Sequence, residues 1–333
     1  MANAKKKGNK EKHLIGIDLG GTKILAAVIS PKGDILATVK RATPAADSAG
    51  AGMDSMAEAA KRAMTKAGVK RRDILVVGAG APGPLNPITG IIHFTPNLKK
   101  WKNVPLAAGL AKRLKLPAFV HNDVDAGTYG EFKVGAGKGV KDLIGLFPGT
   151  GIGGGIILDG RLRTGFRGSA GELGHLIVLA DGPVCGCGNR GCVEAVASRT
   201  AITRDIRLAL QSGCTSVIGE LVENPQTDRI TSGTLARAAE QEDALVLEVL
   251  RRAAYYLGLL TANMVNALDP ERIVFGGGLI EACEPWLLPT IRDVAQQYYL
   301  NKHDMDKVKV LAAELGDYAT VLGAAMLARD RLG

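Results

Sequence analysis

Short apolar runs alternate with longer amphipathic segments along the chain, a pattern typical of α/β folds. The first run, Leu14–Ile17, leads into a glycine turn and a second apolar run over Ile24–Ile29. A Pro-Lys-Gly-Asp turn then precedes a third run over Ile35–Val39. We therefore expect three successive strands joined by short turns.

A second stretch, much later in the chain, follows the same order. Leu143–Phe147 is apolar and runs into the glycine-rich segment Pro148–Gly155. Ile156–Leu158 is apolar again and precedes an Asp-Gly pair, which is a hairpin signal. The same strand-turn-strand unit is therefore expected twice. No low-complexity linker separates the two halves, so the repeat places their boundary near Val120.

Helices are expected where apolar residues recur every three or four positions. This spacing occurs over Met53–Ala67 and over Ala244–Leu268, where Pro270 limits the second helix. A further strand is expected over Arg272–Phe275, and a final helix over Ala319–Arg331.

The composition excludes several classes of protein. The chain has 333 residues, 46% of them hydrophobic, which allows two domains with a substantial core and argues against disorder. The longest uncharged runs, 143–158 and 253–268, are interrupted by Gly, Pro or Asn and are too short to span a membrane. No apolar stretch of signal-peptide length follows the first lysines. We expect a cytoplasmic protein without a membrane partner.

Much of the net charge of +9 lies at the amino terminus, where five lysines stand against one glutamate within residues 1–13. Charge runs at a terminus are most often solvated. Binding of DNA by such a tail alone would be weak and sensitive to salt. We therefore interpret residues 1–13 as a basic disordered tail and expect no specific nucleic-acid partner.

Glycine accounts for 43 residues, and many of them are grouped at the expected turns. A strand that turns back through Gly20, Gly21 and Thr22 can direct successive backbone N–H groups at one anion, because glycine has no Cβ. Phosphate is the expected anion. Thr22 would add a hydroxyl, and Asp18 would add a carboxylate that could hold Mg²⁺ or its water shell. The second hairpin offers a matching loop with Gly149, Thr150, Gly151 and Gly153.

Neither loop follows the Walker pattern or the pattern G-x-G-x-x-G, and glycines more often serve turns than ligands. Two matched hairpins and a third glycine run at Gly276–Gly278 nevertheless favour phosphate binding when they are taken together.

One segment carries a metal-ligand pattern. His175 is followed, after nine residues, by Cys185, Cys187 and Cys192, which together provide one imidazole and three thiolates for a closed tetrahedral Zn²⁺ site. A closed shell leaves no position for an activated water, so we expect a structural zinc and not a Lewis acid. The alternative, three buried thiols and a core histidine, is disfavoured because the segment is rich in glycine and not apolar.

Three carboxylates invite a catalytic interpretation. Asp123 follows the apolar segment Ala118–Val120, so we expect it at a strand end, where ligands of α/β folds bind. Taken alone, the Asn122-Asp123 pair would be a turn or a helix cap. Glu172 and Glu194, taken alone, would suit a glycosidase pair, but nothing else in the sequence supports hydrolysis.

Six motifs together resemble a known family. They are DLGGT at Asp18–Thr22, GAPGP at Gly80–Pro84, Asn122-Asp123, AGELGH at Ala170–His175, CGCGNRGC at Cys185–Cys192 and FGGG at Phe275–Gly278. In this set, which covers nearly everything after residue 13, the chain is similar to the ROK family of sugar kinases and repressors, and most of all to its glucokinases.

The resemblance implies the actin-like (ribonuclease H-like) ATPase fold, with two α/β domains and a cleft between them. We expect a smaller domain over residues 14–120 and 318–333. The larger domain is expected over residues 121–317, with the zinc-binding segment at 175–192.

The resemblance also implies roles for single residues. Asp123 matches the family's catalytic base, which accepts the proton of the attacking hydroxyl. The positions implied to bind sugar hydroxyls are Asn97, Asn122, Asp123, Glu172, His175 and Glu194. The positions implied to lie near the nucleotide phosphates are Gly20, Gly21, Thr22, Lys23, Thr150 and Gly151. Those implied to lie near adenosine are Gly276, Gly277, Gly278 and Leu279.

The expected reaction is transfer of the γ-phosphoryl group from ATP, with Mg²⁺, to the 6-hydroxyl of glucose. One alternative changes the sugar to N-acetylmannosamine, N-acetylglucosamine, mannose or fructose, and another changes the donor to polyphosphate. A sugar-sensing ROK repressor would place a DNA-binding module first, but only 17 residues precede Asp18. A generic actin-like ATPase would have no need of the His175 and cysteine cluster. The family also implies a homodimer or homotetramer.

Overall fold

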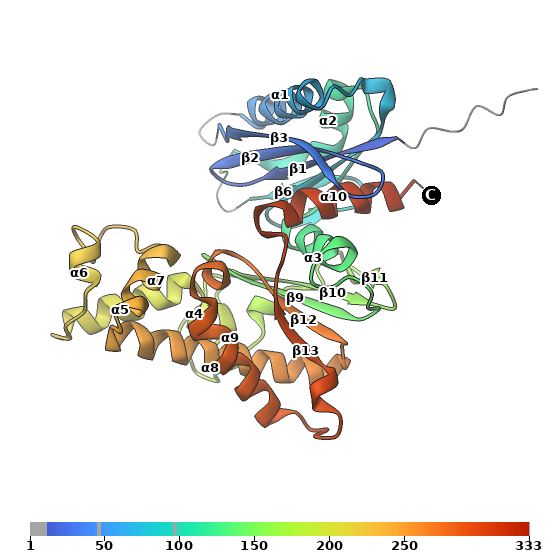
Figure 1. The fold of residues 1–333 in the computed structure, drawn as a ribbon. Helices are drawn as coiled ribbons and strands as arrows, with labels where there is room; N and C mark the ends of the chain where they lie inside the picture. Colours follow the sequence, from blue (N-terminus) through green and yellow to red (C-terminus); the bar gives the residue numbers. More distant parts are fainter. Residues whose placement is uncertain (1–11, 45–47, 96–97, 99, 333) are drawn as a thin grey trace, which may run out of the picture. The chain divides into compact units, whose positions relative to one another are not determined.

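The computed structural model describes residues 12–44, 48–95, 98 and 100–332 (Figure 1). The chain forms two compact units. Unit 1 comprises Met1–Gly130 and Thr320–Gly333, and unit 2 comprises Glu131–Ala319. The chain passes from one unit to the other within helix α3 (Asp123–Val134) and at the first residue of helix α10 (Ala319–Asp330).

The main sheet of unit 1 has the strand order β3-β2-β1-β4-β8. The strands are β1 (His13–Leu19), β2 (Lys23–Ile29), β3 (Ile35–Ala42), β4 (Ile74–Ala81) and β8 (Ala118–Asn122). β1, β2 and β3 are antiparallel neighbours, whereas β1, β4 and β8 run parallel. A smaller sheet joins β5 (Leu85–Asn86), β6 (Ile91–Phe94) and β7 (Lys102–Pro105).

Helices cover both faces of the main sheet of unit 1, which explains why β1, β2 and β4 are almost continuously apolar (Figure 1). α1 (Ala49–Ala67) and α2 (Leu106–Leu114) lie on one face and α10 on the other. α10 packs directly on β1 and β4, because a Cβ at Gly16 or Gly78 would lie only 2.0 or 1.9 Å from a backbone oxygen of that helix.

Unit 2 repeats this topology. Its sheet has the order β11-β10-β9-β12-β13, with β9, β10 and β11 antiparallel and β9, β12 and β13 parallel. The strands are β9 (Leu143–Pro148), β10 (Ile152–Leu158), β11 (Arg161–Leu162), β12 (Arg272–Phe275) and β13 (Lys309–Ala312). The duplicated strand-turn-strand unit predicted from the sequence is confirmed.

The helices of unit 2 build one large core around α8. They are α4 (Val193–Ala197), α5 (Arg199–Gln211), α6 (Ile218–Leu221), α7 (Ser232–Glu240), α8 (Ala244–Leu268) and α9 (Gly278–Tyr298). Short 3₁₀ helices η1 to η4 cover Arg71–Asp73, Leu173–His175, Met305–Lys307 and Gly316–Tyr318.

Sequence periodicity located several of these elements closely. α8 and β12 have the bounds that were predicted, because a capping Asp243 and Pro270 mark the ends of the helix. α1 begins at Ala49 and not at Met53, because the Ser48 side chain accepts a hydrogen bond from the Ala51 N–H and caps the helix there.

One expectation is corrected. The glycines Gly153–Gly155 belong to strand β10 and not to a loop, and Gly153 pairs with Phe147. A Cβ at Gly154 would lie 2.6 Å from the Leu173 side chain, so the absence of side chains lets η2 pack closely against this strand.

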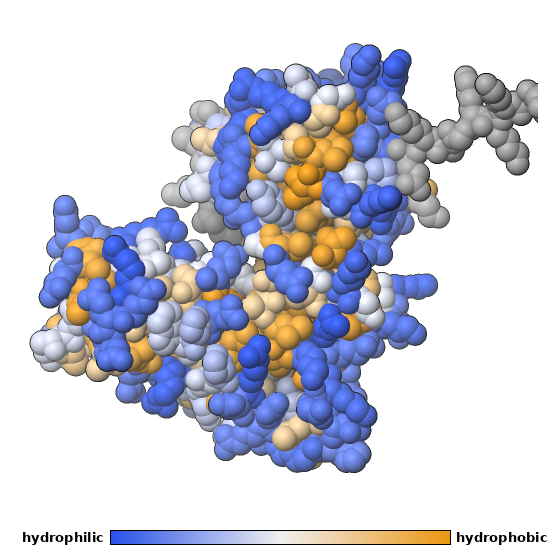
Figure 2. Space-filling view, viewed as in Figure 1, coloured by the Kyte–Doolittle hydropathy of each residue, from blue (hydrophilic) through white to orange (hydrophobic). Residues whose placement is uncertain are grey.

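Figure 2 shows that hydrophilic side chains cover most of the visible face of each unit, with apolar side chains exposed in patches between them. Within the described residues, no helix combines the length and the hydrophobicity needed to cross a membrane.

Strand β8 carries a buried histidine directly before Asn122. His121 is 6% exposed, and its Nε2 has no hydrogen-bond partner among the described residues. Arg331, whose guanidinium lies 5.1 Å from the centre of the Phe119 ring, adds a positive charge nearby. Burial, followed by repulsion from Arg331, lowers the pKa of His121 from 6.5 to about 4.

This burial predicts a pH dependence of stability. The pKa of His121 in the folded protein lies below its unfolded value. Its contribution to the free energy of unfolding is therefore fully present above pH 6.5 and is lost as the pH falls towards about 4. We expect this loss to reach about 3 kcal/mol and to be absent from His121→Phe. Urea unfolding at several pH values measures it. His303→Gln, at an exposed histidine, is the control and should keep the wild-type profile. Superimposable profiles for His121→Phe and wild type would contradict the expectation.

Candidate active site and metal centre

The parallel strands of unit 1 end side by side at one edge of the sheet. The register pairs Asp18 with Gly80, and Gly80 with His121, so the residues that follow β8 lie beside the ends of β1 and β4. A Cβ at Gly80 would lie 3.4 Å from the Cα of Asp123. The fold thus brings Asp18 and Asp123, far apart in sequence, to the same sheet edge, where α/β folds bind ligands.

The Asn122-Asp123 pair starts helix α3. The Asn122 Oδ1 accepts hydrogen bonds from the N–H groups of Val124, at 2.8 Å, and Asp125, at 3.1 Å. Asn122 is therefore a helix cap, as the local alternative suggested, and its amide nitrogen is the donor it can still offer a ligand. The backbone oxygen of Asp123 accepts a hydrogen bond from the Thr320 hydroxyl at 3.2 Å, which ties this turn to α10.

The β1–β2 turn is tightly closed. The Gly20 N–H donates to the Lys23 carbonyl at 2.9 Å, and a Cβ at Gly20 would lie at the same distance from that oxygen. Thr43 braces the turn from outside: its hydroxyl donates to the Gly20 carbonyl at 2.8 Å. Thr22 and Lys23 are exposed at the tip and Gly21 is half-buried. No sequence motif pointed to Thr43, because its contact is made across 23 residues.

The β9–β10 turn is the equivalent feature of unit 2. The Gly149 N–H donates to the Gly151 carbonyl at 2.8 Å, and Thr150 is exposed at the tip. A Cβ at Gly151 would lie 2.4 Å from the Glu194 Oε2, so only glycine allows this carboxylate to approach the turn. Gly153 lies beyond the turn, inside strand β10.

The third glycine run connects β12 to α9. The Gly276 N–H donates to the Leu146 carbonyl at 2.9 Å, and Gly277 adopts a φ of 81° immediately before α9 begins at Gly278. The side chain of Leu279 is fully buried in the core of unit 2. Leu279 can therefore meet a ligand only through its backbone.

His175 and three cysteines converge into one cluster of unit 2. Their ligand atoms all lie within 4.8 Å of one another. The Sγ atoms of Cys187 and Cys192 are 3.7 Å apart, and the Cys185 Sγ lies 3.6 Å from the His175 Nδ1. Zn–S bonds of about 2.3 Å in a tetrahedron place two sulfurs about 3.8 Å apart. The donor set and its spacing therefore fit zinc, whereas the separations are far too long for a disulfide.

The backbone of the cysteine segment is shaped by glycine. The Cys185 N–H donates to the Asn189 carbonyl at 2.8 Å, closing a turn in which Gly188 has a φ of 94°. Gly191 has a φ of 71°, and a Cβ there would lie 1.7 Å from the Leu179 carbonyl oxygen. Both positions require glycine for conformation, and Gly191 requires it for space as well. They hold Cys192 directly before α4, where it is the N-cap residue.

Burial disfavours ionisation of two of the three thiols of the cluster. Burial raises the pKa of Cys185 to about 12 and also raises that of Cys192. A hydrogen bond from the Asn189 backbone lowers the pKa of Cys187. Zinc binds thiolates and releases their protons, so a bound dication would stabilise the negative charges that burial otherwise disfavours.

Glu194 connects the metal cluster to the β9–β10 turn. It lies in the first turn of α4, two residues after Cys192. Its Oε2 accepts a hydrogen bond from the Ile152 N–H at 2.9 Å, and its Oε1 lies 3.6 Å from the Cys185 thiol, which donates to it. Glu172 is exposed at the start of η2, three residues before His175.

A family model described as the ROK family matches residues 14–331. The chain belongs to the ROK family. Among curated relatives of this family, the glucokinase of Thermotoga maritima is 36% identical over 320 residues, covering 96% of this chain and 98% of the relative.

Solved structures give the same result. A ROK family glucokinase from Streptomyces griseus in complex with glucose and AMPPNP has a TM-score of 0.81 and 34% identity, over 96% of this chain and 99% of that one. A ROK hexokinase from Thermus thermophilus has a TM-score of 0.80 at 34% identity with the same coverage. The actin-like, ribonuclease H-like α/β fold expected from the sequence is confirmed.

Asn97 lies outside the described residues, although the neighbouring Thr95 hydroxyl donates to the Leu98 carbonyl at 2.9 Å. The other expected site residues gather in unit 1 at the ends of β1 and β8, and in unit 2 around the glycine turns and the cysteine cluster.

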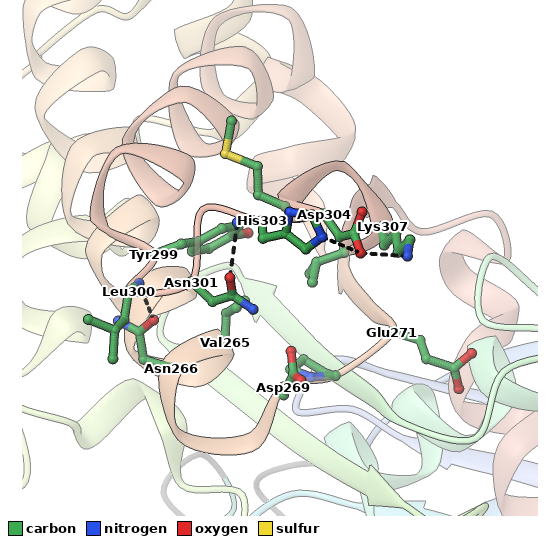
Figure 3. Close-up of a pocket in the computed structure, with 13 residues that line it drawn as sticks. Val265, Asn266, Asp269, Glu271, Tyr299, Leu300, Asn301, His303, Asp304 and Lys307 are labelled. Carbon is green, nitrogen blue, oxygen red and sulfur yellow. Dashed lines mark hydrogen bonds and ion pairs between the residues drawn. The ribbon is translucent and has the colours of Figure 1, made fainter.

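Unit 2 also contains a pocket of about 650 Å³ that no motif indicated (Figure 3). It lies where α8 ends and β12 begins, and its polar lining includes Asp269, Glu271 and Asn301. This is the amino end of β12, whereas the glycine turns follow the carboxyl ends of β9 and β12. The pocket is therefore separate from the candidate site.

The cysteine cluster predicts a bound metal. We expect about one zinc per chain in protein purified without chelators, and Cys187→Ser should lose most of it and lower the Tm by several degrees, because a closed four-ligand site contributes its binding energy to folding. Elemental analysis and calorimetry measure both effects. Cys214→Ser, at an exposed cysteine outside the cluster, is the matched control. Full zinc content in Cys187→Ser, or none in the wild type, would rule out this assignment.

Proposed function

We propose that this protein is an ATP-dependent glucokinase, which transfers the γ-phosphoryl group of ATP to the 6-hydroxyl of glucose. The observation that carries the proposal is similarity to glucokinases over nearly the full chain at 34–36% identity. The Streptomyces griseus structure, whose ligands are glucose and the ATP analogue AMPPNP, supports the choice of both substrates.

Asp123 is proposed as the catalytic base. Its position at the start of α3, beside the ends of β1 and β4, supports this role, because a fixed carboxylate can orient the sugar hydroxyl and accept its proton as the phosphoryl group is transferred. The Thr320 hydroxyl, bonded to the Asp123 backbone, keeps that position defined.

The sugar is proposed to lie against side chains that reject analogues without matching hydroxyls. Asn122 would donate through its amide nitrogen, since its Oδ1 caps α3. His175 would use Nε2, because its Nδ1 faces the Cys185 sulfur. The remaining proposed sugar ligands are Asn97, Glu172 and Glu194.

The nucleotide is proposed to bind through the glycine turns. Backbone N–H groups around Gly20–Thr22 and Gly149–Gly151 would bind the phosphates, with Lys23 at the tip of the first turn and Gly153 behind the second. Gly276–Leu279 would contact adenosine through their backbone. Asp18 would hold Mg²⁺ or its water shell, and the ion, when bound, neutralises charge on the β- and γ-phosphates.

Zinc is proposed as a structural ion. Its four ligands are all protein side chains, so it would hold His175 and Glu194 in place without contacting the reacting groups. We further propose a location in the cytoplasm, where ATP is available, and assembly as a homodimer or homotetramer.

The first test is release of ADP by purified enzyme with Mg²⁺-ATP and a panel of sugars. We expect glucose to give the highest kcat/KM, above mannose, fructose, N-acetylglucosamine and N-acetylmannosamine, with polyphosphate a poor substitute for ATP. Preference for another sugar or for polyphosphate would refute the glucokinase assignment. Inactivity on every sugar by folded, zinc-loaded protein would favour a sugar-sensing role.

The second test addresses the base. Asp123→Asn should lower kcat by about 10²- to 10⁴-fold, the usual contribution of general base catalysis, while glucose binding is largely retained. Steady-state kinetics and glucose titration by calorimetry provide the two readouts. Asp54→Asn, at an exposed aspartate on α1, should behave as wild type. An unchanged kcat in Asp123→Asn would refute the role.

A further inference from the structure

Arg199 packs against the β9–β10 turn from the start of helix α5. Its backbone N–H donates to the Gly149 carbonyl at 2.9 Å, and its guanidinium donates to the Thr150 hydroxyl. The neighbouring Thr200 hydroxyl donates to the Thr150 carbonyl at 2.6 Å. These contacts place a positively charged group at the exposed tip of a glycine turn.

The turn occupies the same place in unit 2 as Gly20–Thr22 occupies in unit 1. Each lies between the first two strands of a sheet with the same order and orientation. The first turn is braced by the hydroxyl of a neutral residue, Thr43, whereas the second is braced by an arginine. A hydrogen bond that only supports the turn needs no charge, as Thr43 shows. Arg199 therefore adds a positive charge that Thr43 does not provide.

Arg199 has no acidic partner among the described residues. Two other arginines, Arg204 on α5 and Arg252 on α8, differ in this respect, because both form ion pairs with Asp205, at 2.7 and 2.5 Å. Arg199 is nevertheless half-buried, and burial, followed by the charge of Arg229, lowers its pKa. Two arginines therefore lie near one another, one of them partly removed from water and without a counter-ion.

A guanidinium has five N–H donors and remains charged at any physiological pH. The bond to Thr150 uses one of them. Within the part of the chain that the structure describes, the other donors form no hydrogen bond, so they can bind an anion at the turn. A phosphate oxygen is the acceptor whose geometry they match best.

We infer that Arg199 binds the phosphate chain of the nucleotide at the Gly149–Gly151 turn, with Arg229 adding to the positive field. The inference rests on the proposed function for the identity of the donor. The charge of Arg199 is compensated when the donor is bound, and the Thr150 contact orients the guanidinium beforehand. The contact is with phosphate and not with adenosine or sugar, which makes Arg199 a determinant of donor affinity.

The test measures binding without turnover. We expect Arg199→Gln to weaken binding of Mg²⁺-ADP and of inorganic tripolyphosphate by about 10- to 100-fold each, the usual effect of losing a charged hydrogen bond. The affinities for adenosine and for glucose should be unchanged. Arg199→Lys, which keeps the charge but loses the planar fork, should fall between wild type and Arg199→Gln. Isothermal titration calorimetry provides all four affinities.

Arg251→Gln, at an exposed arginine on α8 that pairs with Glu248, is the matched control and should bind every probe as wild type does. Zinc content and thermal unfolding establish that each variant is folded. Tripolyphosphate affinity that is unchanged in Arg199→Gln would overturn the inference and leave Arg199 as a structural brace. Equal weakening for adenosine, or wild-type protein that binds neither ADP nor tripolyphosphate, would overturn it as well.

Failure of the inference is distinct from failure of the proposed function. If the wild-type enzyme phosphorylates glucose and Arg199→Gln binds tripolyphosphate as tightly as wild type, the proposed function stands and the inference about Arg199 fails. If the protein phosphorylates no sugar but its binding of tripolyphosphate depends on Arg199, the inference stands and the proposed function fails.

Discussion

Each unit depends on one constraint: a buried strand must reverse within a few residues so that the next strand pairs with it. In unit 1 the reversal is closed by the hydrogen bond from the Gly20 N–H to the Lys23 carbonyl, and in unit 2 by the bond from the Gly149 N–H to the Gly151 carbonyl. Both turns sit at the carboxyl ends of parallel strands, where other strands also stop. The same requirement that closes the sheet therefore creates a backbone surface suited to phosphate.

In unit 2 this turn, the metal cluster and a carboxylate form one connected block. Glu194 bonds the Ile152 N–H on one side and faces the Cys185 thiol on the other. This arrangement requires glycine at position 151, because a side chain at Gly151 would collide with the Glu194 carboxylate. Glu194 therefore contacts both the cysteine segment and the strand that follows the turn. A zinc ion bound by the cysteines would thus help to fix the geometry of the proposed site through this carboxylate.

Local and functional interpretations of a motif are compatible in this chain. The Asn122-Asp123 pair is a helix cap, as its composition alone suggests, because Asn122 satisfies two backbone N–H groups of α3. The same cap fixes Asp123 at the sheet edge beside β1 and β4. The Val124 N–H also lies 3.0 Å from the Asp123 Oδ1, to which it donates, so the first turn of the helix contacts this carboxylate directly.

The sequence by itself determined the features that local patterns encode. Periodicity and capping residues predicted the bounds of α8, and short apolar runs predicted β12 and the repeated hairpin. The order of ligand residues predicted that His175 and the three cysteines form one cluster. Such signals are confined to a few neighbouring residues, and their physical cause is equally local. The family and its fold were also evident, because the glycine and cysteine motifs are specific in combination.

Only the tertiary structure decided which distant groups meet. Gly153–Gly155 form a strand because Phe147 and its neighbours pair with them, although glycine disfavours strands locally. Leu279 is withdrawn into the core, and Thr43 and Arg199 reach the two turns from elements that carry no motif. Contacts of this kind depend on how strands and helices pack in three dimensions. The positions of these residues in the sequence therefore do not predict such contacts.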